Sequence, residues 1–75
     1  AAPNNKALEK KIRAVEREVE KQEAAVAAYD PQIEAAASDY QELTRLMAEK
    51  AGAEEQLAAL MEQWEALSLE LEGEE

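Results

Sequence analysis

The segment DPQIEAAASDYQ, residues 30–41, separates two stretches of helical periodicity. Pro31 lacks a backbone N–H and its ring crowds the preceding turn, so the first helix is expected to end beside it. Ser38 and Gln41 have the spacing of a capping box, which predicts Ser38 as the N-cap of a second helix. A short helical turn over residues 32–37 fits between these signals. The segment therefore predicts a chain reversal between two long helices.

Apolar side chains on both sides of this segment recur with the alternating steps of three and four that are typical of a coiled coil. The first seam consists of Leu8, Ile12, Val15, Val19, Gln22, Val26 and Tyr29. The second seam consists of Leu43, Leu46, Lys50, Ala53, Leu57, Leu60, Trp64, Leu67 and Leu71. The pattern predicts an all-α fold, a two-helix antiparallel coiled-coil hairpin.

The expected organisation is one small domain with short ends. Its parts are expected at residues 1–5 (a linker or a cloning remnant), 6–72 (the coiled-coil hairpin) and 73–75 (a frayed tail). Inside the hairpin, the pattern predicts a helix at about 5–29, a loop at about 30–38 and a helix at about 39–71.

The two seams also predict a register. If the numbers of facing residues sum to 72, Gln22 faces Lys50 and each seam's polar residue avoids a purely apolar neighbour. The same register places Trp64 opposite Leu8. An antiparallel pair also brings the lysines at the start of the first helix beside the glutamates at the end of the second. Each set of charges is unfavourable to the dipole of its own helix, so the two opposite sets offset each other.

The composition excludes several classes of function. The 75 residues carry a net charge of −10, which opposes general binding to nucleic acid or to an anionic membrane surface. Cysteine and histidine are absent from the sequence, so the usual zinc ligands are missing, and no apolar run approaches the length of a membrane span. There is also no glycine-rich phosphate loop and no nucleophile–histidine pair. We therefore expect a domain without catalysis, bound metal or bound cofactor, and without membrane contact.

One surface pattern indicates a possible partner. Basic residues recur at steps of four, three, four and four on the outer face of the first helix: Lys6, Lys10, Arg13, Arg17 and Lys21. We call these five residues the basic stripe, and such a row can follow the phosphates of DNA or RNA. The alternative is a solvated face held by local ion pairs, for which Glu9–Arg13, Arg17–Glu20 and Glu18–Lys21 have suitable spacing.

Three features together resemble a known family. They are the connection from Asp30-Pro31 to Ala35-Ala36-Ala37-Ser38-Asp39-Tyr40-Gln41-Glu42-Leu43, the leucine heptads that follow, and the ending Leu60-Met61-Glu62-Gln63-Trp64-Glu65-Ala66-Leu67. Over about residues 6–71 the chain resembles the C-terminal coiled-coil domain of ABC-F ATPases, especially the Uup-like branch.

The resemblance implies a non-catalytic accessory domain of a cytoplasmic ATPase rather than of a transporter. The parent protein would bind ATP and magnesium in two cassettes outside this domain. The domain would tether or position the parent on nucleic acid or on the ribosome, with the basic stripe as the contact to DNA or RNA. Its other partners would be the parent's own ATPase domains, and the hairpin would be monomeric, with a dimer as the alternative.

Two other readings remain open at this level. One is the tRNA-contacting coiled-coil arm of a valyl-tRNA synthetase, which is also an antiparallel hairpin. The other is a purely structural coiled coil that dimerises into a four-helix bundle. For such a bundle, Met47 and Met61 beside the second seam would widen the contact surface.

Overall fold

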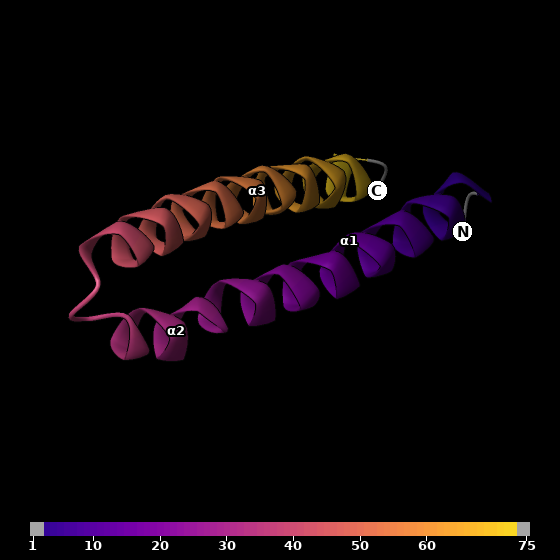
Figure 1. Ribbon diagram of the computed structural model, residues 1–75. Coiled ribbons are helices and arrows are strands. Elements are labelled where there is room, and N and C mark those ends of the chain that lie inside the picture. Colours follow the sequence, from indigo (N-terminus) through magenta and orange to yellow (C-terminus); the bar gives the residue numbers. More distant parts are fainter. Residues whose placement is uncertain (1–2, 74–75) are drawn as a thin grey trace.

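The computed structural model describes residues 3–73, together with the side-chain environments of residues 6–73. It contains three helical segments: α1 (Pro3–Ala27), α2 (Tyr29–Ala35) and α3 (Tyr40–Gly73). Segments α1 and α2 follow each other along one arm, and α3 returns beside them in the opposite direction (Figure 1). The described chain measures 58 × 14 × 11 Å, as expected for two helices side by side. The predicted all-α antiparallel hairpin is confirmed.

The first arm is longer than the sequence pattern predicts. Residues 29–35 form α2, where a short helical turn over residues 32–37 was expected inside the loop, and a single turn residue, Ala28, separates α2 from α1. Pro31 is compatible with this helix because it lies in the first turn, where a backbone N–H has no intrahelical acceptor. The side-chain amide of Gln32 donates to the carbonyl of Ala28 at 3.1 Å and so satisfies an acceptor at the break. The expected loop at residues 30–38 is therefore wrong, and the reversal occupies residues 36–39.

Helix α3 is capped by Asp39, and the prediction of Ser38 as N-cap is wrong. The Asp39 carboxylate accepts from the backbone N–H of Glu42 at 3.2 Å, and the Asp39 carbonyl accepts from Leu43 at 2.9 Å. The Asp39 N–H itself donates to the carbonyl of Ala36 at 2.9 Å, which closes the turn that contains Ser38. An aspartate at this position both caps the first turn and complements the helix dipole.

The ends of the domain also differ slightly from expectation. Helix α1 begins at Pro3, so residues 3–5 of the expected linker are helical. Helix α3 includes Gly73, the first residue of the expected frayed tail. The remaining residues of these two segments, 1–2 and 74–75, lie outside the described residues.

The register differs from the predicted one by about one heptad. Gln22 donates to the carbonyl of Ala53 at 3.0 Å and to the side chain of Gln56 at 3.2 Å, rather than facing Lys50. Trp64 contacts Glu16 rather than Leu8. The residue numbers of the observed partners sum to between 75 and 80. A slip of seven residues changes the predicted sum of 72 to 79, which lies within this range. The prediction fails because α2 extends the first arm, and a slip of one heptad still keeps both seams in contact.

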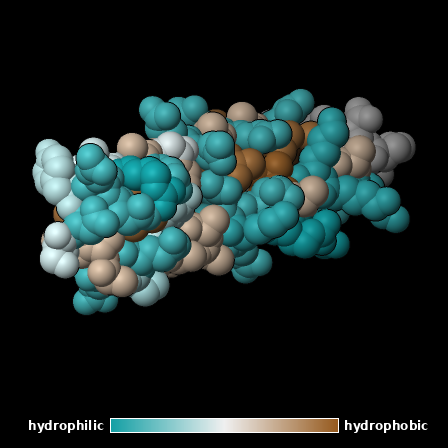
Figure 2. All heavy atoms as spheres, in the orientation of Figure 1, coloured by the Kyte–Doolittle hydropathy of each residue, from teal (hydrophilic) through white to brown (hydrophobic). Residues whose placement is uncertain are grey.

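The core is a thin seam between the two arms. The buried apolar residues are Leu8, Val15, Ala36 and Leu46, and most other seam residues are half-buried. Figure 2 shows a largely hydrophilic face, with hydrophobic atoms visible in a limited area toward the end where the termini lie. Two helices cannot enclose a core on all sides, so apolar groups remain accessible at the flanks of the seam.

Candidate interaction faces of the hairpin

The basic stripe lies where the sequence predicts it, on the exposed surface of α1. All five side chains are exposed. With 3.6 residues per turn they fall within an arc of about 80°, and their Cα atoms extend over about 22 Å of the helix axis. Within residues 6–73 none of the five forms an ion pair, so the local pairs suggested for this face are not formed. The ammonium and guanidinium groups are therefore available to a partner.

The cations of α3 are in a different situation. Arg45 is paired with Glu42 and Glu49, and Lys50 donates to Asp30 of α2 at 2.9 Å. The hydrogen bond and charge of Glu42, followed by those of Glu49, raise the pKa of Arg45 above its usual value. The Asp30 carboxylate likewise raises the pKa of Lys50. Helix α3 carries eight glutamates, and its two cations are already paired, so the outer surface of α3 is acidic.

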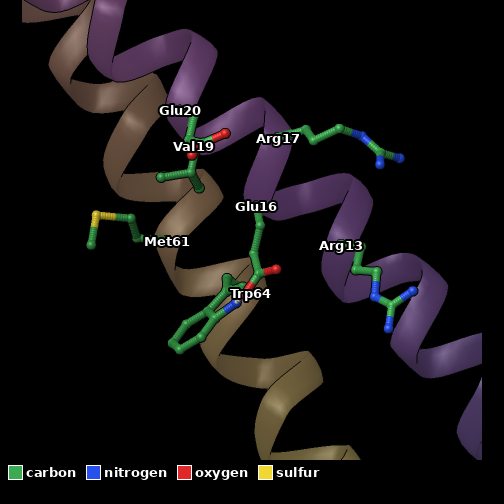
Figure 3. A pocket seen from close by; sticks show the side chains of 7 residues that line it. All are labelled: Arg13, Glu16, Arg17, Val19, Glu20, Met61 and Trp64. Carbon is green, nitrogen blue, oxygen red and sulfur yellow. Dashed lines mark hydrogen bonds between the residues drawn. The ribbon is translucent and has the colours of Figure 1, made fainter.

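A groove of about 540 Å³ runs between the two arms beside the basic stripe (Figure 3). It is lined by Arg13, Glu16, Arg17, Val19 and Glu20 of α1 and by Met61 and Trp64 of α3. The indole N–H of Trp64 donates to the carboxylate of Glu16 at 3.0 Å. In Figure 3 Arg17 extends from the side of α1 that faces away from the indole, whereas Arg13 lies across the front of α1. The groove therefore combines an aromatic wall with carboxylates, and the cations lie at its outer edge.

Trp64 was expected in the core, because it occupies a seam position. The structure instead leaves it 39 % exposed as part of the groove wall. The heptad slip explains this difference, since it places the indole at the level of Glu16, whose carboxylate holds the indole N–H at the flank of the seam. The sequence gives one indication of this groove wall, because Met61 lies one helical turn before Trp64 and their side chains are therefore neighbours on α3.

The two polar seam residues satisfy their hydrogen bonds separately. Gln22 binds the α3 backbone and Gln56, whereas Lys50 reaches sideways to Asp30. These contacts stabilise the helix pair and do not form a binding site.

Among residues 3–73 there is no helix both long and apolar enough to cross a bilayer. The described part of the chain also contains no group of three or more carboxylates arranged to hold a metal ion.

The chain was compared with protein families, curated proteins and solved structures. A family model described as the ABC transporter C-terminal domain matches residues 5–69, which is most of the chain and nearly the whole hairpin. Comparison with curated proteins and with solved structures found no match.

Proposed function

The chain belongs to the ABC transporter C-terminal domain family, and we propose that it is a non-catalytic accessory domain of a cytoplasmic ABC-F ATPase that positions the ATPase on nucleic acid or the ribosome. ATP and magnesium would be bound by the cassettes of the parent protein. The family match favours this function over a valyl-tRNA synthetase arm. The hairpin's contribution is to hold a charged helix face at a defined distance from those cassettes.

The observation that carries the proposal is the basic stripe. Its five exposed cations have no ion-pair partner within residues 6–73, while Arg45 and Lys50 of α3 are already paired. A row of free cations gains free energy on meeting phosphates because bound counterions are released. The stripe is therefore the part of this surface best suited to DNA or RNA.

The net charge of −10 does not oppose contact at this face as strongly as it opposes general binding. The excess acid is concentrated in residues 30–75, with a charge of −11, whereas residues 1–29 carry +1. At physiological salt the Debye length is about 8 Å, comparable with the roughly 10 Å diameter of a helix. The stripe is thus partly screened from the carboxylates on the outer side of α3.

The test is fluorescence anisotropy of labelled duplex DNA and structured RNA, titrated with the domain at low and at physiological salt. We expect binding that weakens with salt and that is strongly weakened in Arg13→Glu/Arg17→Glu. Removing two phosphate contacts is expected to lower the slope of log affinity against log salt by about two.

A matched control separates the stripe from the overall charge. Lys11→Glu/Arg45→Glu changes the net charge by the same amount but alters one cation outside the stripe on α1 and one on α3, and it should retain binding. If both variants lose binding equally, the contact is not specific to the stripe. If the unaltered domain binds neither nucleic acid at low salt, the proposed nucleic-acid contact is wrong.

A further inference from the structure

We propose that one flank of α3 is a docking surface for a basic amphipathic helix of a partner protein. The surface is built on Tyr40, Met47, Met61 and Trp64, which we call the methionine stripe. Tyr40, Met47 and Met61 are separated by seven and fourteen residues, so they lie on one face of the helix, and Trp64 follows Met61 by one turn. Their exposed fractions are 81 %, 56 %, 51 % and 39 %.

In the methionine stripe Tyr40, Met47 and Met61 are each more than half exposed, and Glu54 separates the two methionines. Ala51 and Ala58 lie between the methionines on the same side of α3, and both are exposed. From Tyr40 to Trp64 the stripe extends over about 36 Å, the length of more than six helical turns. An extended apolar surface on an otherwise charged helix marks an interaction site. Methionine side chains also adapt readily to differently shaped partners.

The opposite wall of this flank is acidic. Glu9, Glu16, Glu23 and Asp30 recur every seven residues along the first arm. Two members of this series reach across to α3, because Glu16 accepts from Trp64 at 3.0 Å and Asp30 accepts from Lys50 at 2.9 Å. Glu9 and Glu23 share that face by helical periodicity and form no ion pair within residues 6–73. On α3 itself, Glu54 lies on the face of the methionine stripe, midway between Met47 and Met61.

An apolar strip beside a row of carboxylates defines the chemistry of the occupant. A helix that presents apolar residues at seven-residue spacing would cover the methionines, and lysine or arginine beside them would meet the acidic wall. A second copy of this chain fits less well. It would bring either another acidic α3 or the same series of glutamates onto this surface. Nucleic acid also fits less well, because the carboxylates along this flank outnumber Arg13 and Arg17, which line the groove near Trp64 together with Glu16 and Glu20.

Two synthetic peptides test the proposal. Both carry the same heptad pattern of leucine and methionine and no aromatic residue, one with lysine and the other with glutamate at the flanking positions. Trp64 is the only tryptophan of the chain, so its emission reports directly on this surface. We expect the lysine peptide to change Trp64 emission saturably and to gain helical circular dichroism, and the glutamate peptide to do neither. Absence of a response to the lysine peptide, or equal responses to both, overturns the proposal.

Two double variants separate apolar docking from simple charge attraction. Met47→Glu/Met61→Glu alters exposed positions of the methionine stripe and is expected to weaken binding of the lysine peptide by about tenfold or more. Attraction by charge alone would instead make this variant bind more tightly, since it gains two carboxylates. Ala48→Glu/Leu69→Glu adds the same charge at exposed positions away from the stripe and should retain binding. Circular dichroism checks that each variant is folded.

Other partners of the methionine stripe would give different results in these experiments. A concentration-dependent dimer of the chain alone, dissociated by Met47→Glu/Met61→Glu, would assign the surface to a second copy. A single-stranded oligonucleotide that quenches Trp64 and competes with the peptide would assign it to nucleic acid. Either result overturns the proposal. Lys10→Glu/Lys21→Glu, at positions of the basic stripe outside the groove, should weaken nucleic-acid binding while peptide binding persists, which distinguishes this surface from the basic stripe.

Discussion

At the scale of single residues, the start of α3 depends on a choice between two neighbours. Ser38 and Asp39 are both good N-cap residues, and each has a residue capable of completing a capping box three positions later, Gln41 or Glu42. The structure selects Asp39, because the Asp39 N–H closes the turn onto Ala36 and its carboxylate then lies over the Glu42 N–H. A shift of one residue in the turn geometry therefore decides which side chain caps the helix.

This choice leads to a stability prediction. Asp39→Ala should lower the free energy of unfolding by about 1 kcal/mol through loss of the cap. Ser38→Ala, next to it, should change the free energy by less than about 0.5 kcal/mol, as is usual for an exposed residue without a special role. Urea unfolding followed by circular dichroism measures both. A larger loss for Ser38→Ala would contradict the assignment of the cap.

The polar seam residues show a second effect at this scale. Pairing Gln22 with Lys50 rests on the idea that a polar residue in a seam must face another polar residue. In a two-helix pair, long side chains can instead leave the seam sideways, as Lys50 does toward Asp30 and Gln22 does toward the backbone of Ala53. Because the core is thin, these polar side chains avoid the free-energy cost of burial without a partner. Nothing therefore enforces the predicted pairing of Gln22 with Lys50.

At the scale of helices, α2 begins before the short helical turn expected at residues 32–37 and includes Pro31. Proline is read as the end of a helix because it breaks an interior hydrogen bond, but in the first turn it breaks none. The break at Ala28 converts Pro31 from an interior residue of α1 into a first-turn residue of α2. The first arm thereby gains two helical turns, and the heptad seam continues through Ile33 to Ala36.

The contrast between two proline positions tests this account. Pro31→Ala should change the free energy of unfolding by less than about 1 kcal/mol, because the proline is already compatible with its helix. Ala24→Pro, at an exposed position inside α1, should destabilise the hairpin by about 3 kcal/mol or more. Thermal and urea unfolding by circular dichroism compare the two. Equal effects would mean that Pro31 does not occupy a first turn.

At the scale of the whole molecule, the register decides which surfaces exist. Only with the observed register does Trp64 lie beside Glu16, and only then does the groove between Arg13, Glu16 and Met61 form. The same slip places Lys50 beside Asp30 and neutralises a cation that would otherwise lie in the seam. The groove is therefore a property of the pairing and of neither helix alone.

The register can be measured on the unaltered protein by nuclear magnetic resonance. Cross-relaxation from the indole ring of Trp64 should reach protons of Glu16 and its neighbours. The register predicted from the heptad pattern places Leu8 at that position, and Leu8 lies eight residues from Glu16, about 12 Å along the helix axis. Contacts from the indole to Leu8, without contacts to Glu16, would establish the register that sums to 72 and would remove the groove.

Features that depend on one helix at a time follow from the amino-acid sequence alone. Heptad periodicity specifies which face of each helix is apolar, and α-helical spacing alone places the five cations of the basic stripe together. The register, the extent of the reversal and the position of Trp64 depend on how the two arms pair in three dimensions. A heptad pattern is unchanged by a slip of seven residues, so it cannot distinguish two registers that both keep the seams in contact. That distinction depends on non-local contacts, such as those of Lys50 with Asp30 and of Trp64 with Glu16.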